Sequence, residues 1–361
     1  MDKQWYQSLA ESGIGGELPA KETCECLLTD SRVELLPLLD AAFQVRKHFH
    51  GKEVTVHIIN NVSNGLCSED CNYCPQSKSS SAGIVAYPEK TEKEIIAEAK
   101  QAYAAGAHRY CMVYAGRRPD RLRTERIANL VRTIKEQYPL EVCVSAGIMD
   151  DESTRLLKES GLDRLNHNLN TSAGRYGEIC STHTFADRLN TLKAARKAGL
   201  EVCSGIIAGM GETAGELIEL ALILRNLAAK SIPINFLLPI AGTRLENAPN
   251  LSPEYCLKIL CLFRFLNPQA EIRTAAGREY HLRSMEVMSL YPANSLFMDG
   301  YLNTRGKSRK DTLRMIIDAG FTIKSDKTAA ELLVHETTDT GKDHYSISGL
   351  KSDLELHPAR N

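Results

Sequence analysis

Three cysteines lie close together in the first third of the chain: Cys67, Cys71 and Cys74, in the order Cys-x3-Cys-x2-Cys. Thiolates are soft ligands that favour iron–sulfur clusters, zinc or copper(I). A structural zinc site takes four ligands, usually as two closely spaced pairs, and no second pair follows nearby. Three thiolates can instead hold three irons of a 4Fe–4S cube and leave the fourth iron open to a ligand that is not protein. The spacing therefore predicts a cluster with a catalytic role.

Three further cysteines, Cys111, Cys143 and Cys203, lie inside predicted strands, and Arg273 lies in another. Taken singly, each cysteine is interpreted as a small buried hydrophobe. Taken together, they converge if their side chains point into a barrel. A buried arginine is costly unless it is paired or bound. The set predicts a second metal centre, and a structural ion pair remains the alternative role for Arg273.

The elements that must position these residues alternate regularly from residue 54 to about residue 320. Short apolar runs rich in β-branched residues are followed by longer amphipathic segments, eight times in all. Such alternation predicts an α/β fold, a (β/α)8 TIM-type barrel over residues 51–322, with a doubly wound sheet as the alternative. The predicted strands are residues 54–60, 108–114, 141–146, 164–168, 201–208, 232–238, 271–275 and 295–298.

Three segments flank or interrupt this pattern. Residues 1–50 are predicted to form an N-terminal helical extension, and residues 323–361 a polar, flexible tail. The long loop of residues 63–87 carries the first three cysteines and follows the first strand. A loop in that position lies on the C-terminal face of a barrel, where active sites are built.

The composition is that of an ordinary soluble protein. The 361 residues are 43% hydrophobic and carry a formal net charge of −1, which gives no argument for nucleic acid or an anionic membrane. The N-terminus is polar, so neither a signal peptide nor a spanning helix is expected, and we expect a cytoplasmic protein. In a reducing compartment, 11 cysteines, an odd number, argue against a disulfide framework and point to buried packing, metal binding or catalysis.

The motifs around these cysteines resemble a known family. The Cys67–Cys74 spacing is typical of the radical S-adenosylmethionine (SAM) superfamily. Within it, the chain resembles the biotin synthases over about residues 30–322. The resemblance is carried by residues 71–77 (CNYCPQS), 166–172 (NHNLNTS), 203–205 (CSG) with 209–212 (GMGE), 233–237 (PINFL), and 273–279, which have the pattern Arg-x-x-x-Gly-Arg-Glu.

This resemblance implies a reaction. SAM binds the open iron of the 4Fe–4S cluster on Cys67, Cys71 and Cys74, and its reductive cleavage releases a 5′-deoxyadenosyl radical. The radical activates dethiobiotin, and an auxiliary 2Fe–2S cluster donates the sulfur that completes biotin. The family's ligands for that second cluster match Cys111, Cys143, Cys203 and Arg273.

The resemblance also implies contacts to cofactor and substrate. Tyr73 matches the aromatic residue against the SAM adenine, Asn168 and Asn170 match ribose contacts, and Arg188 matches the partner of the SAM carboxylate. Asn168 and Asn235 match contacts to the ureido ring of dethiobiotin, and Thr304 a contact to its carboxylate. Two positions depart from the family pattern: Asn170 replaces an aspartate found in some members, and Asn303 replaces a threonine.

Further expectations and alternatives follow. Expected partners are dethiobiotin, an electron donor such as flavodoxin or ferredoxin, iron–sulfur assembly proteins and a second copy of the chain in a homodimer. The alternatives are another radical SAM barrel enzyme, of the hydrogenase maturase or methylornithine synthase type, a non-catalytic iron–sulfur or zinc protein, and a metal-independent barrel such as an aldolase. No chemistry is assigned to the remaining residues of interest: Cys24, Cys26, Cys180, Cys256, Cys261 and His167.

Overall fold

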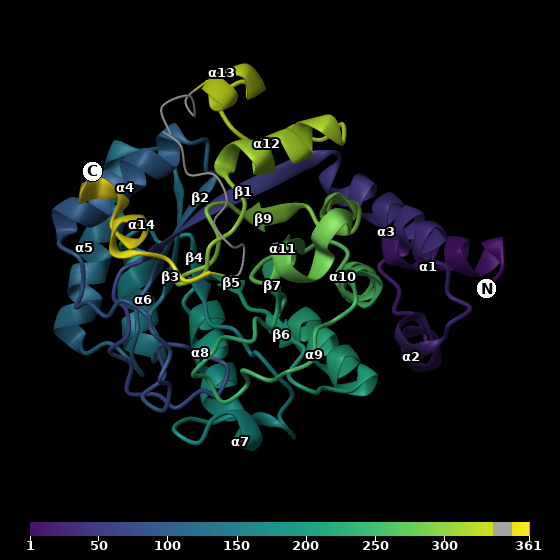
Figure 1. The fold of residues 1–361 in the computed structure, drawn as a ribbon, viewed down its shortest axis with the longest axis horizontal. Helices are drawn as coiled ribbons and strands as arrows, with labels where there is room; N and C mark the ends of the chain where they lie inside the picture. The colour runs from purple at the N-terminus through teal and green to yellow at the C-terminus, as the bar shows by residue number, and fades with distance from the viewer. Residues whose placement is uncertain (335–348, 361) are drawn as a thin grey trace.

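The computed structural model describes residues 1–334 and 349–360, and its centre is a closed parallel barrel (Figure 1). Neighbouring strands pair in chain order, except that β5 and β6 both pair with β7, and β1 pairs with β9 to close the cylinder. The (β/α)8 barrel predicted from the sequence is thus confirmed. Its strands are β1 (Glu53–Asn61), β2 (Arg109–Val113), β3 (Glu141–Ser145), β4 (Arg164–Asn166), β5 (Glu201–Cys203), β6 (Ile206–Ala208), β7 (Ser231–Phe236), β8 (Glu271–Thr274) and β9 (Ser295–Phe297).

The fifth strand position is divided between β5 and β6. Both pair with β7, but the ladder is interrupted at Ser204 and Gly205. A Cβ atom on Gly205 would lie 1.8 Å from the carbonyl oxygen of Pro233. Because only glycine allows this approach, the segment 204–205 can lie against β7 and lead from the level of Cys203 up to β6.

Helices cover the outside of the barrel. Three of them begin with a capping box, Thr91–Glu94, Thr184–Asp187 and Thr213–Glu216, which satisfies backbone N–H groups at the helix start. Within the described part of the chain, none of the helices is both long and apolar enough to cross a membrane. The covering helices are α4 (Glu92–Ala104), α5 (Arg121–Gln137), α6 (Asp151–Glu159), α7 (Tyr176–Ile179), α8 (Phe185–Lys197), α9 (Ala214–Asn226), α10 (Pro253–Leu266), α11 (Arg278–Leu282), η1 (Arg283–Leu290) and α12 (Arg309–Asp318).

The N-terminal segment forms three helices, α1 (Lys3–Gly15), α2 (Lys21–Thr29) and α3 (Leu35–His50), which lie beside α10 (Figure 1). Their apolar side chains, including Leu38 and Val45, belong to the same buried cluster as the barrel. The buried Arg46 guanidinium donates to the carbonyl oxygens of Ala293, Gly51 and Glu53 at 2.8–3.0 Å. This arginine therefore ties α3 to the starts of β1 and β9.

The C-terminal segment, expected as a polar, flexible tail over residues 323–361, contains short elements where the structure describes it. β10 (Thr322–Ile323) pairs with β1, and it is followed by α13 (Ala329–Val334). α14 (Asp353–Leu356) and η2 (Pro358–Arg360) lie near α4, and the buried His357 ring lies 4.3 Å from the ring of Tyr87. These contacts arise because a few apolar and aromatic side chains in the polar segment find partners on the barrel. Residues 335–348 lie outside the described residues.

Candidate active site

The loop after β1 brings Cys67, Cys71 and Cys74 to one cavity of about 270 Å³ at the carboxyl ends of the strands. The loop turns tightly there, because the Cys74 N–H donates to the Cys71 carbonyl oxygen at 3.1 Å. Burial raises the pKa of the Cys74 thiol to about 11, so it favours the neutral thiol until a metal replaces the proton. Three thiols around one cavity form a donor set that fits the 4Fe–4S cluster expected for this loop.

The four residues expected to bind SAM line the same cavity. The Asn170 side-chain amide donates to the Tyr73 hydroxyl at 2.6 Å, and Arg188 donates to the Asn168 carbonyl oxygen at 2.8 Å. Asn170 has φ of 69°, a left-handed conformation that asparagine adopts more readily than most residues. Burial lowers the pKa of Arg188, but nearby Tyr73 and other groups raise it overall, so the guanidinium stays charged. The cavity thus offers a cation together with amide groups.

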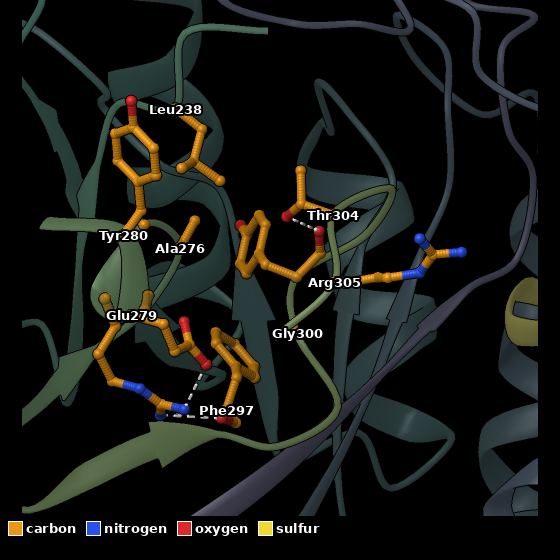
Figure 2. A pocket seen from close by; sticks show the side chains of 12 residues that line it. Leu238, Ala276, Glu279, Tyr280, Phe297, Gly300, Thr304 and Arg305 are labelled. Atoms are coloured by element: carbon orange, nitrogen blue, oxygen red, sulfur yellow. Dashed lines mark hydrogen bonds and ion pairs between the residues drawn. The ribbon is translucent and has the colours of Figure 1, made fainter. Parts of the chain in front are cut away.

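The residues expected to bind dethiobiotin also line this cavity. The Asn235 amide is held on both sides, since it donates to the Ile206 carbonyl oxygen at 2.8 Å and accepts from the Ala276 N–H at 3.2 Å. The Thr304 hydroxyl donates to the Tyr301 carbonyl oxygen at 2.9 Å (Figure 2). Asn303 is paired with Asn64 through two side-chain hydrogen bonds of 2.6 and 2.9 Å.

A small second cavity lies deeper in the barrel and is lined by Cys111, Cys143, Cys203 and Arg273. Cys111 and Cys143 are directly opposite one another on β2 and β3, and all three thiols belong to one buried cluster. The hydrogen bond between the Cys111 and Cys143 thiols lowers the pKa of Cys111 and raises that of Cys143 to about 12. Val113, Ser145, Asn166 and Tyr301 line both cavities, so the two sites adjoin.

Arg273 lies between the second cavity and a polar layer beneath it. Its guanidinium donates to the hydroxyls of Ser231 and Ser295 at 2.7 and 2.9 Å and forms an ion pair with Glu271. Its Nη1 atom lies 3.9 Å from the Cys203 sulfur. The arginine is therefore both ion-paired and present at the cavity. None of the described residues that line this cavity carries a carboxylate, so the thiols are its soft, metal-binding groups. Three thiols with one arginine fit a small iron–sulfur centre.

The polar layer under the second cavity was not anticipated from the sequence. The Glu271 carboxylate meets His57, Arg109 and Arg164 at 3.0–3.2 Å, in addition to Arg273. Burial raises the pKa of Glu271, but the surrounding charges, above all the guanidinium groups of Arg273, Arg109 and Arg164, hold the pKa well below its usual range. The sequence did contain a signal for this layer, because charged residues stand two positions before the strand cysteines. Arg109 and Cys111, for example, must lie on the same face of their strand, so a charge points inward with the thiol.

Cys180 and His183 were also missed. Cys180 follows α7, and its sulfur lies 3.7 Å from the sulfur of Cys71. His183 precedes α8 and contacts Cys180 through Nδ1 at 3.3 Å. Neither residue falls on a position carried over by the family resemblance, although the Cys-x2-His spacing was visible in the sequence.

Comparisons with known proteins agree with this arrangement. Residues 61–224 match the family model described as Radical SAM superfamily, and residues 233–322 match the Biotin and Thiamin Synthesis associated domain. A biotin synthase of Magnetococcus marinus is 55% identical over 88% of this chain and 98% of its own length. The chain belongs to the biotin synthase family. Biotin synthases of Acaryochloris marina and Leptospira interrogans are 54% and 48% identical over 82% and 80% of the chain, and over 86% and 82% of their own lengths.

Solved structures of other enzymes share the barrel of this chain, at lower sequence identity than the biotin synthases. Methylornithine synthase superposes with a TM-score of 0.76 at 22% identity, over 90% of this chain and 99% of its own. The FeFe-hydrogenase maturase of Carboxydothermus hydrogenoformans gives a TM-score of 0.76 at 18% identity, over 92% and 82% of the two chains. At these identities the likeness shows the fold alone. The rival enzyme classes considered from the sequence therefore share the architecture and are not favoured as the function.

Proposed function

We propose that this chain inserts sulfur into dethiobiotin to form biotin, as a radical SAM sulfurtransferase. The observation that carries the proposal is the pair of adjoining cavities: three loop thiols at the upper one, and three strand thiols with Arg273 at the lower one. When bound, the 4Fe–4S cluster supplies the electron that cleaves SAM, and the 2Fe–2S cluster supplies the sulfur. The protein's part is to hold, orient and desolvate the reactants.

The residues proposed for the upper cavity divide this work. Cys67, Cys71 and Cys74 hold the 4Fe–4S cluster, and the Arg188 guanidinium presents its planar fork to the SAM carboxylate. Tyr73 packs against the adenine. Asn168 and Asn170 bind the ribose, and the hydrogen bond between Asn170 and Tyr73 fixes both side chains relative to each other.

The residues proposed for the lower cavity hold the 2Fe–2S cluster: Cys111, Cys143, Cys203 and Arg273. Because the three cysteines are buried on strands rather than on a loop, their positions are fixed by the barrel. Arg273 is oriented by Glu271, Ser231 and Ser295, so that one nitrogen faces Cys203.

Dethiobiotin is proposed to lie between the two sites. Amide groups suit its ureido ring, since each offers both a donor and an acceptor. Asn168 and Asn235 are proposed to bind this ring, and Thr304 to bind the carboxylate. Asn235 is held by backbone groups of Ile206 and Ala276, which limits the rotation of its side chain.

The partners and the organisation of the chain complete the proposal. The electron donor is a small redox protein such as flavodoxin or ferredoxin, and iron–sulfur assembly proteins load the clusters. The enzyme works as a cytoplasmic homodimer. Its barrel unit is residues 51–322, and residues 1–50 and 323–361 are extensions of that unit.

The test is an anaerobic reaction of the reconstituted protein with dethiobiotin, SAM and a reductant, read by mass spectrometry for biotin. The expected result is biotin together with 5′-deoxyadenosine, and neither product from a Cys67→Ala variant. Formation of 5′-deoxyadenosine without biotin would assign the barrel to another radical SAM reaction. Iron and sulfide analysis that accounts for the first cluster alone would contradict the second cluster.

A further inference from the structure

Cys71, Cys180 and His183 form a compact group whose potential ligand atoms all lie within 4.8 Å of one another. All three side chains are buried. The two sulfurs are 3.7 Å apart, and the Cys180 sulfur is 3.3 Å from His183 Nδ1. Only Cys71 belongs to the proposed cluster site, so Cys180 and His183 give this thiol a second set of neighbours.

The spacing of these atoms suits one tetrahedral ion. A zinc ion with Zn–S bonds of about 2.3 Å holds two sulfurs roughly 3.8 Å apart. A disulfide needs a sulfur–sulfur distance of about 2.05 Å, so the two cysteines would have to move together to form one. The observed separation of 3.7 Å matches the metal geometry without movement.

The backbone holds the two segments in this position. The Asn72 N–H donates to the Ile179 carbonyl oxygen at 2.9 Å. The Asp70 carboxylate accepts from the N–H groups of Ser181 and Thr182 at 2.9 and 3.2 Å. Cys71 and Cys180 are thus fixed from both sides, and the closeness of their sulfurs does not depend on a flexible loop.

The surroundings balance the charge of a divalent ion. Two thiolates neutralise it, and the carboxylates of Asp70 and Glu69 contact Cys180 and His183 respectively. The Tyr176 hydroxyl lies 2.8 Å from His183 Nε2 and can accept a hydrogen bond from Nε2–H when Nδ1 binds a metal. In the cluster-free chain Arg188 also donates to Nε2, at 2.8 and 3.1 Å, so metal binding through Nδ1 requires this guanidinium to turn away and Nε2 to take the proton that Nδ1 shares with Glu69.

We propose that Cys71, Cys180 and His183 bind a single divalent ion of the zinc class in the cluster-free protein. Binding releases the two thiol protons, and the fourth position is taken by water or by Glu69. Because Cys71 cannot serve both sites, this ion and the 4Fe–4S cluster exclude one another. Zinc bound in the cluster-free enzyme thus opposes the loading of the cluster.

Cobalt(II) is the probe, because tetrahedral thiolate coordination gives it intense visible bands. The full chain, stripped of clusters and kept reduced without oxygen, is expected to bind one cobalt with this spectrum and to release it to zinc. Cys180→Ala is expected to lose the spectrum, and His183→Gln to weaken binding by at least about tenfold. The matched control is Cys67→Ala, which removes a proposed cluster ligand but keeps all three residues of the new site.

Several outcomes would overturn the proposal. They are a thiolate spectrum kept by Cys180→Ala and lost by Cys67→Ala, an absence of cobalt binding, and a Cys71–Cys180 disulfide that persists in the presence of reductant. Reconstitution with iron and sulfide shows that Cys180→Ala is folded, since it should build the 4Fe–4S cluster as the wild type does. Zinc added first should slow that reconstitution in the wild type and not in Cys180→Ala. The cobalt measurement involves no turnover, so its failure is distinct from a failure of the proposed function.

Discussion

At the scale of single residues, Arg273 and the loop cysteines differ in how replaceable they are. Arg273 is one of several cations around Glu271, and it contributes one of four groups to the lower cavity. Each loop cysteine is one of three thiols at the upper cavity, where the proposed cluster keeps its fourth position for SAM. Loss of a loop cysteine should therefore have the larger effect on chemistry.

Cys67→Ala is expected to abolish reductive cleavage of SAM, because two thiolates cannot hold the cube with a single open iron. The measurement is 5′-deoxyadenosine by liquid chromatography after anaerobic reconstitution with iron, sulfide and a reductant. Cys26→Ala is the control, since Cys26 lies on α2 among the N-terminal helices. Equal amounts of 5′-deoxyadenosine from both variants would remove Cys67 from the cluster.

Arg273→Ala is expected to lower biotin formation by less than about 100-fold and to leave the absorption of the second cluster visible. Glu271 keeps Arg109, Arg164 and His57 as partners in this variant, so no buried charge is abandoned. The measurements are turnover and the visible spectrum of the reconstituted protein. A complete loss of the second cluster would mean that the arginine is an indispensable ligand.

Glu271→Gln should be far more damaging to stability, because three buried guanidinium groups then lose their shared carboxylate. Removal of one member of a buried ionic network commonly costs about 3–5 kcal/mol. The expected result is a clearly lower melting temperature than that of Arg273→Ala, measured by circular dichroism on the cluster-free chains. Equal melting temperatures would show that the polar layer contributes no net stabilisation through Glu271.

At the scale of elements, the division between β5 and β6 depends on one glycine. An alanine at position 205 would meet the Pro233 carbonyl oxygen at 1.8 Å, which forces β6 or β7 to move. Gly205→Ala is therefore expected to lower the melting temperature and to weaken SAM binding, since Asn170 donates its N–H to the Gly205 carbonyl oxygen at 3.0 Å. Gly174→Ala is the control, as nothing lies within 4 Å of its Cβ position.

The strand positions could be predicted because parallel barrel strands are buried on both faces and appear as short apolar runs between amphipathic helices. The two cysteine groups followed from spacing and from the inward faces of those strands. Charged residues two positions before the strand cysteines indicate an inward-facing polar layer, but their partners around Glu271 could not be predicted, since ion pairing depends on the barrel's register and not on local sequence. Cys180 lies 109 positions along the chain from Cys71, and although Cys180 and His183 form a visible Cys-x2-His pair, no local pattern places that pair beside Cys71.

The segment of residues 278–290, which follows the predicted strand at residues 271–275, shows a further limit of prediction from the sequence. The structure has α11 up to Leu282 and then the 3-10 helix η1 from Arg283, which adopts φ of 52°. Nothing in the type of residue at 283 indicates this break. Tertiary contacts lie at this break, because the buried Glu286 forms ion pairs with Arg278 and Lys307.

At the scale of the whole molecule, buried histidines link stability to pH. Burial lowers the pKa of His50 to about 3 and that of His108 to about 4, and it holds the pKa values of His57 and His167 well below 6.5. In the unfolded chain these histidines titrate near the ordinary pKa of about 6.5. Between that pH and the lowered pKa values, the unfolded chain therefore binds protons that the folded chain does not. Unfolding then takes up protons, so stability is present at neutral pH and falls as the pH is lowered below about 6.5.

His50→Leu tests this linkage at one position, where the cations of Arg264 and Arg46 add to burial in lowering the pKa. The melting temperature of the cluster-free chain should fall between pH 7.5 and pH 5.5, and it should fall less steeply in His50→Leu, because one proton fewer is taken up on unfolding. His48→Leu is the matched control, since His48 lies on the same helix with an exposed side chain. A pH dependence in His50→Leu as steep as that of the wild type and of His48→Leu would mean that His50 makes no contribution, and that other groups account for the loss of stability in acid.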